Sequence, residues 1–204
     1  MRVTFRSGEL TIEGALAPSD GATRGAVVCH PHPQYGGDMN NNVVMAVSKV
    51  LHDSGQATLR FNFRGVGASD GSYSNGVGEA EDARAAVTYL IERAGVQAIT
   101  LAGYSFGAMV VLQAGVNLPA VDRLIAVAPP LAFFSLDGLS ACTQEKLFIV
   151  GDNDQYCSVA QLTRQLSSVA APKAHQVVHG ADHFFIGYET ALTESVRAFG
   201  LTRA

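Results

Sequence analysis

Apolar residues fall along the chain in short runs that alternate with longer segments of helical spacing. Five runs are rich in β-branched residues and mostly end in Gly, Pro or Asp, which is typical of buried strands: residues 25–29, 57–63, 98–102, 124–128 and 146–150. Segments with helical periodicity lie between and after them, and predict helices over residues 42–53, 78–93, 106–115, 159–169 and 189–199. The alternation predicts right-handed βαβ units and a mainly parallel, doubly wound sheet.

The two edges of this sheet differ from its centre. Residues 3–5 and 10–16 alternate polar and apolar side chains across a Ser-Gly turn, which predicts an antiparallel hairpin at the N-terminal edge. Residues 176–178 are expected to form the last strand. Because no repeat, low-complexity tract or linker interrupts the sequence, we expect one α/β domain over residues 1–204.

Composition narrows the class of partner. The chain carries 14 Lys and Arg against 18 Asp and Glu, a formal net charge of -4, and has no basic block that could follow a nucleic-acid backbone. The N-terminal residues do not resemble a secretion signal, and no apolar stretch approaches the roughly 18 residues that span a bilayer. Cys29, Cys142 and Cys157 form no C-x-x-C pair, so free thiols are expected. We therefore expect a cytoplasmic protein that binds neither nucleic acid nor membrane, with its oligomeric state left open.

The clearest chemical motif is G-x-S-x-G at residues 103–107, between a predicted strand and an apolar helix. The two glycines permit a strained turn that lifts Ser105 above the sheet. The helix start, with the N–H of Phe106, then faces any negative charge that develops on a substrate. Ser105 could instead be an ordinary helix N-cap. Its place after a buried strand favours a nucleophile.

A serine nucleophile needs a general base and an acid that orients this base, and in this context the chain order is serine, acid, histidine. Asp152 and Asp154 both follow the strand at 146–150. We favour Asp154, which lies past the turn where a side chain can reach inward. Asp152 and, more weakly, Asp137 remain alternatives, and either of the first two could be a simple turn former.

The candidate base is His183, in a loop rich in Gly and Asp between the last strand and the final helix. His179, at the end of the strand, is an alternative. His30 and His32 are further alternatives, because they follow the strand at 25–29 and therefore lie at the same edge of the sheet.

The loop that begins H-P-H-P at residues 30–33 is expected to supply a second oxyanion donor. Proline has no N–H, so the donor must be the backbone of His32, Gln34 or a later residue, acting together with Phe106. His30 and His32 could alternatively bind a metal, but no nearby carboxylate or thiol pair completes a recognisable set, and we predict no metal. Residues 64–71 superficially resemble a dinucleotide turn. They lack the third glycine and the helix that such a turn requires, so we predict no cofactor and a structural loop.

Together these motifs resemble the small bacterial α/β-hydrolases with an HPHP loop, over nearly the whole chain. The residues that carry the resemblance are 30–33 with 36–37, 61–69, 103–107, 151–154 and 180–185. The resemblance implies a triad of Ser105, Asp154 and His183 and an esterase or dienelactone-hydrolase-like activity. Dienelactone hydrolases proper use a cysteine nucleophile where this chain has Ser105, which disfavours that particular activity.

Many relatives insert a lid domain after the strand that corresponds to residues 124–128, but here only residues 129–144 intervene. We therefore predict an α/β-hydrolase fold without a lid domain and with an open site. Four aromatic side chains are candidate walls of the acyl pocket or ordinary core residues: Tyr35, Phe133, Phe134 and Phe184. The sequence thus predicts hydrolysis of short-acyl carboxylic esters, with a small acyl compound as substrate. A thioesterase, an amidase or a non-catalytic binding protein of the same fold is the alternative.

Overall fold

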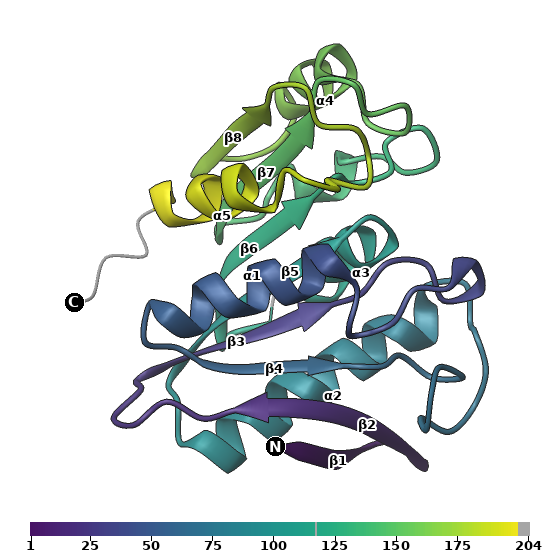
Figure 1. Cartoon of the computed structure of the whole chain (residues 1–204), viewed down its shortest axis with the longest axis vertical. Helices are drawn as coiled ribbons and strands as arrows, with labels where there is room; N and C mark the ends of the chain where they lie inside the picture. The colour runs from purple at the N-terminus through teal and green to yellow at the C-terminus, as the bar shows by residue number, and fades with distance from the viewer. Residues whose placement is uncertain (117, 200–204) are drawn as a thin grey trace.

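The structure is a computed structural model that describes residues 1–116 and 118–199. These residues form one eight-stranded sheet with the order β1-β2-β4-β3-β5-β6-β7-β8 (Figure 1). Strand β2 runs antiparallel to both β1 and β4, and all other neighbours are parallel. The predicted sheet, mainly parallel with an antiparallel N-terminal edge, is confirmed. Its strands are β1 (Arg2–Ser7), β2 (Leu10–Ala17), β3 (Arg24–Cys29), β4 (Ala57–Phe61), β5 (Ala98–Tyr104), β6 (Val121–Val127), β7 (Glu145–Gly151) and β8 (Lys173–Val178).

Helices cover both faces of this sheet, and each face has its own apolar core. Buried side chains of α1 and α5 form one core with the sheet, and those of α2, α3 and α4 form the other. Figure 1 shows α1 and α5 on the face toward the viewer. The helices are α1 (Asn42–Asp53), α2 (Val77–Ala94), α3 (Phe106–Ala114), α4 (Val159–Leu166) and α5 (Glu189–Ala198), and two short 3-10 turns are η1 (Pro33–Tyr35) and η2 (Asp137–Leu139).

Several strand boundaries differ from the sequence prediction, two of them for identifiable reasons. Strand β4 ends at Phe61 rather than at residue 63, because the N–H of Phe63 donates to the ring of His30 instead of to a neighbouring strand. Strand β8 begins at Lys173, earlier than predicted. Its first four side chains are exposed at the edge of the sheet, so they carry no apolar signal.

The connection between β6 and β7 contains η2 and otherwise loop, which confirms the absence of a lid domain. Among the described residues, no helix is both long and apolar enough to cross a membrane. The three cysteines are buried free thiols.

The loop at residues 64–71 and the neighbouring Asn62 are held by hydrogen bonds to the side chain of Glu13. The Glu13 carboxylate accepts the N–H of Ala68 at 2.7 Å and the side-chain amide of Asn62 at 2.6 Å. The side-chain oxygen of Asn62, Oδ1, accepts the N–H of Met39 at 2.8 Å. These contacts agree with the structural role predicted for the loop, and they anchor the segment that follows β3.

Candidate active site

Ser105 lies at the turn between β5 and α3 in a strained conformation. Its φ of 55° and ψ of -117° lie outside the backbone regions that non-glycine residues usually adopt. Such backbone strain costs energy and is typically found at functional sites. The flanking glycines allow this turn because side chains would not fit. A Cβ at Gly103 would overlap the carbonyl oxygen of Gly107, and a Cβ at Gly107 would lie 2.5 Å from the carbonyl oxygens of Cys29 and His30. The motif thus packs α3 directly against the end of β3.

Three side chains from three loops form a continuous chain of hydrogen bonds. His183 Nε2 lies 2.9 Å from Ser105 Oγ, and His183 Nδ1 lies 2.8 Å from Asp154 Oδ2. The other oxygen of Asp154 accepts the N–H groups of Tyr156 and Cys157 at 2.8 and 3.0 Å. An ionised carboxylate can only accept, so Nδ1 carries a proton; in the neutral imidazole Nε2 is then the acceptor that faces Ser105 Oγ. Both His183 and Asp154 are only 5% exposed, whereas Ser105 is half-buried.

The structure also separates the residues that compete for these positions. Asp152 pairs with His179 at 3.0 Å and accepts the N–H of Gly180 at 2.7 Å. The side chain of His179 is 86% exposed. Asp137 begins η2 and is exposed. Two Asp–His pairs therefore follow the same two strands, and within residues 1–116 and 118–199 only the buried pair contacts Ser105.

Two contacts that the sequence analysis missed hold the loop that carries His183. The hydroxyl of Tyr104 donates to the carbonyl oxygen of His183 at 2.9 Å, and burial together with the charges of Asp154 and Asp182 raises the pKa of Tyr104. The side-chain amide of Asn42 donates to the carbonyl oxygen of Phe184 at 3.1 Å. Tyr104 occupies an unspecified position of G-x-S-x-G, so the motif gave no signal for it. Nothing in the sequence pattern singled out Asn42.

The first histidine of the H-P-H-P loop is buried and fully bonded. His30 Nε2 accepts the N–H of Phe63 at 3.0 Å, and Nδ1 lies 2.6 Å from the carbonyl oxygen of Pro31. Since Nε2 accepts, Nδ1 must carry the proton and donate. Burial lowers the pKa of His30 to about 4, and the bond to Pro31 and the charge of Asp38 offset this only in part. Both ring nitrogens are occupied by the protein, which leaves neither free for a metal.

We expect His30 to make the protein less stable in mild acid. A histidine of pKa 6.5 when unfolded and about 4 when folded binds fewer protons in the folded state. The contribution of neutral His30 to the free energy of unfolding is therefore fully present above pH 6.5. It is lost as the pH falls toward 4, by up to roughly 3 kcal/mol in total. Urea unfolding at pH 7, 6 and 5 measures this slope. In His30→Asn the slope should be shallower, and an unchanged slope would contradict the assignment.

The backbone N–H groups predicted to bind an oxyanion differ in whether the protein already occupies them. Within the described residues, the N–H groups of Phe106 and His32 have no hydrogen-bond partner. The N–H of Gln34 instead donates to His32 Nδ1 at 3.2 Å, inside η1. Of the two residues that the sequence left open for the second donor, the geometry therefore favours His32 over Gln34.

Aromatic side chains gather around the two histidines of the site. Tyr35, Tyr73 and Phe106 have ring centroids 4.7 to 4.9 Å from His32. Around His183, Tyr156 lies at 4.8 Å and Phe184 at 5.7 Å, and Phe133 continues the group 6.2 Å beyond Tyr156. Tyr156 was missed by the sequence analysis. Phe134 differs from the other predicted wall residues because it packs against the core that contains α2 and α3.

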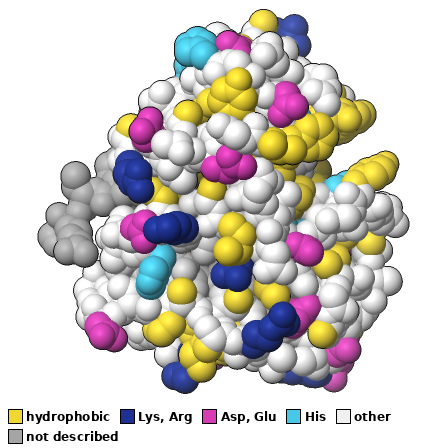
Figure 2. Space-filling model, viewed as in Figure 1, with side chains coloured by type: hydrophobic (Ala, Val, Ile, Leu, Met, Phe, Trp, Pro, Cys, Tyr) yellow, Lys and Arg dark blue, Asp and Glu magenta, His cyan; other side chains and the backbone are white. Residues whose placement is uncertain are grey.

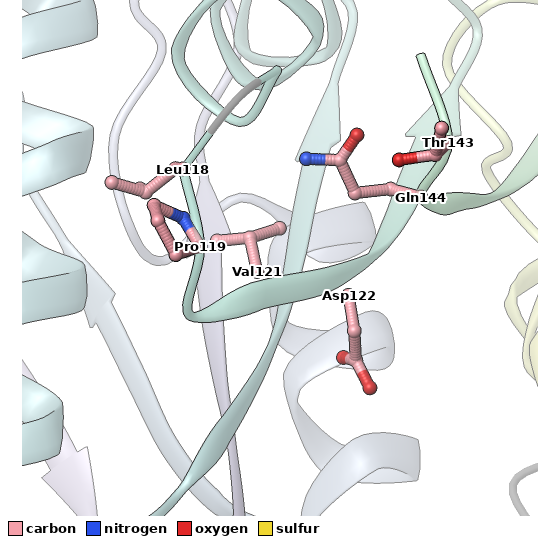
Figure 3. A pocket seen from close by; sticks show the side chains of 6 residues that line it. All are labelled: Leu118, Pro119, Val121, Asp122, Thr143 and Gln144. Atoms are coloured by element: carbon pink, nitrogen blue, oxygen red, sulfur yellow. The ribbon is translucent and has the colours of Figure 1, made fainter.

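Three of these side chains, Tyr35, Phe133 and Phe184, form an aromatic rim that is exposed rather than enclosed. Tyr35 is 87% exposed, Phe133 80% and Phe184 48%. In Figure 2, hydrophobic side chains gather over the loops on the right-hand side of the molecule, beside a hollow between its upper and lower parts. A separate pocket lies at the N-terminal ends of β6 and β7 (Figure 3), whereas Ser105 follows the C-terminal end of β5. It is lined by Leu118, Pro119, Val121, Asp122, Thr143 and Gln144.

Comparisons of the sequence and of the structure with known proteins point to the same fold family. A sequence profile of the alpha/beta hydrolase fold matches residues 27–140. An uncharacterized protein of Rickettsia prowazekii is 35% identical over 194 residues, which are 90% of this chain and 82% of the relative. An alpha-beta serine hydrolase homologue from Coxiella burnetii has a TM-score of 0.90 and 34% identity, and covers 97% of this chain and 96% of its own. A serine hydrolase without a lid from Xanthomonas campestris has a TM-score of 0.85 and 30% identity, with 98% and 92% covered.

Proposed function

The chain belongs to the alpha/beta hydrolase fold family, and from this premise we propose that it hydrolyses small carboxylic esters through Ser105, His183 and Asp154. The observation that carries the proposal is the unbroken line of hydrogen bonds from Ser105 Oγ through His183 to Asp154, at 2.9 and 2.8 Å. A hydroxyl with a neutral imidazole in contact, itself held by a buried carboxylate, is the arrangement that makes serine a nucleophile near neutral pH.

Each group has a defined role in the proposed reaction. His183 Nε2 takes the proton of Ser105 as Oγ attacks the acyl carbon, and Asp154 stabilises the imidazolium that forms. The N–H groups of Phe106 and His32 hold the oxyanion. The imidazolium then protonates the leaving alcohol, and an acyl-enzyme remains on Ser105. Water, activated by the same imidazole, releases the acid. These steps require only the protein and water.

We expect a preference for short acyl chains. An enclosed acyl pocket gains about 0.8 kcal/mol for each methylene that it buries, but an exposed rim buries little of a long chain. A series of 4-nitrophenyl esters from acetate to palmitate tests this directly, with kcat/KM as the readout. The highest kcat/KM should fall at acetate or butyrate. A steady rise toward palmitate would contradict an open site, and no hydrolysis of any ester would contradict the proposed function.

A further inference from the structure

The peptide between Pro31 and His32 lies between two imidazoles, each in a defined tautomer. We propose that His30 and His32 are positioning residues whose rings orient this peptide so that the N–H of His32 faces the oxyanion. The inference rests on the proposed function, because it assigns a task to the two histidines of the H-P-H-P loop within the same site.

His30 fixes one side of the peptide. Its Nδ1–H donates to the carbonyl oxygen of Pro31 at 2.6 Å, while Nε2 is held by the N–H of Phe63. The His30 ring is completely buried against Phe63, with ring centroids 4.6 Å apart. In a trans peptide the N–H points away from the carbonyl oxygen. A ring that holds the oxygen of Pro31 inside the protein therefore turns the N–H of His32 outward.

His32 fixes the other side through its own side chain. Its Nδ1 accepts the N–H of Gln34 at 3.2 Å and so caps η1, and its Nε2 lies 3.1 Å from the hydroxyl of Tyr73. Because a backbone N–H can only donate, Nδ1 is unprotonated and Nε2 carries the proton. The carbonyl oxygen of His32 accepts the N–H groups of Tyr35 and Gly37, both at 3.1 Å. Side chain and backbone of this residue thus close the same turn.

The ring of His32 also couples the H-P-H-P loop to the nucleophile turn. The ring of His32 packs against that of Phe106, 4.9 Å away, and Phe106 supplies the other free N–H. Directly after Phe106, Gly107 packs so closely on the carbonyl oxygens of Cys29 and His30 that no Cβ fits there. The spacing of the two donors is therefore set by this packing. A misplaced donor weakens binding of the tetrahedral oxyanion more than binding of the planar substrate.

The test compares His32→Leu, which removes both ring contacts, with His32→Asn, whose side-chain oxygen can still cap η1. For 4-nitrophenyl butyrate we expect His32→Leu to lower kcat about 10- to 100-fold, less than the usual loss of a whole donor, with KM within about 3-fold. The inhibition constant of a trifluoromethyl ketone, which forms a tetrahedral oxyanion on the serine, should rise by the same factor as kcat/KM falls. His32→Asn should retain most of the activity. His179→Leu, at the exposed histidine, is the matched control and should change neither quantity.

Several outcomes would overturn the inference. One is an inhibition constant in His32→Leu that equals the wild-type value. Another is a kcat in His32→Asn that is as low as in His32→Leu. If His32→Leu does not fold, Tyr73→Phe removes only the hydroxyl at Nε2, and the inhibition constant should again rise in step with the loss of kcat/KM. A constant equal to that of the wild type would contradict the inference. If the wild type hydrolyses esters and is labelled by a fluorophosphonate, but the His32 and Tyr73 variants behave like the wild type, this inference alone is overturned. An unlabelled and inactive wild type overturns the proposed function as well.

Discussion

Replacing Ser105 with alanine will abolish ester hydrolysis and covalent labelling by a fluorophosphonate. The variant keeps His183, Asp154 and the free N–H groups but has no atom to attack the acyl carbon, so kcat should fall by at least about 10⁴-fold. The backbone should hold, because alanine has the same Cβ as serine and the glycines at 103 and 107 still permit the turn. Steady-state kinetics and gel fluorescence after labelling measure the two effects.

Ser140 provides the matched control for this experiment. It is an exposed serine at the end of η2. Ser140→Ala should keep both activity and labelling. If the fluorophosphonate still labels Ser105→Ala, another side chain is the nucleophile. If the wild type is never labelled, a non-catalytic binding protein of the same fold becomes the better interpretation.

The second large effect is expected for Asp154→Asn. The asparagine oxygen can still accept the N–H groups of Tyr156 and Cys157, and its NH₂ group then faces His183 Nδ1 in place of Oδ2. Two donors cannot face each other, so His183 shifts its proton to Nε2 and can no longer accept one from Ser105. This change of tautomer should lower kcat by about 10⁴-fold with little change in the folded structure.

Asp152→Asn is the control for that variant, because it makes the same chemical change two residues away. Asp152 pairs with the exposed His179 and does not contact His183. Its variant should keep kcat within about 3-fold of the wild type, since an exposed ion pair contributes little. Equal losses in the two variants, or a larger loss in Asp152→Asn, would show that the wrong carboxylate has been assigned.

The strands, the helices and the serine turn are predictable from the sequence because their signals are local. Helix α1 spans Asn42–Asp53, as its periodicity predicts. G-x-S-x-G between a strand and an apolar helix identifies Ser105, because close packing of the turn excludes side chains at both glycines. Even the absence of a lid follows from counting the residues between two strands.

The partners of Ser105 are decided only by the tertiary structure. His183 lies 78 residues from Ser105 in the sequence and 29 from Asp154, so their contacts depend on the order of strands in the sheet. The sequence favoured Asp154 over Asp152 from its place past the turn. The structure adds the reason: the loop after β7 turns Asp154 inward, while Asp152 is captured by His179.

The oxyanion loop shows the same division. The sequence alone identifies a loop with two prolines that cannot donate, and so limits the second donor to His32, Gln34 or a later residue. It does not reveal that the ring of His32 occupies the N–H of Gln34, because that contact requires the folded turn. Local residue chemistry therefore determined which groups can react in this protein. The packing of distant loops decided which of them meet, because hydrogen bonds form only between groups that the fold brings together in the right direction.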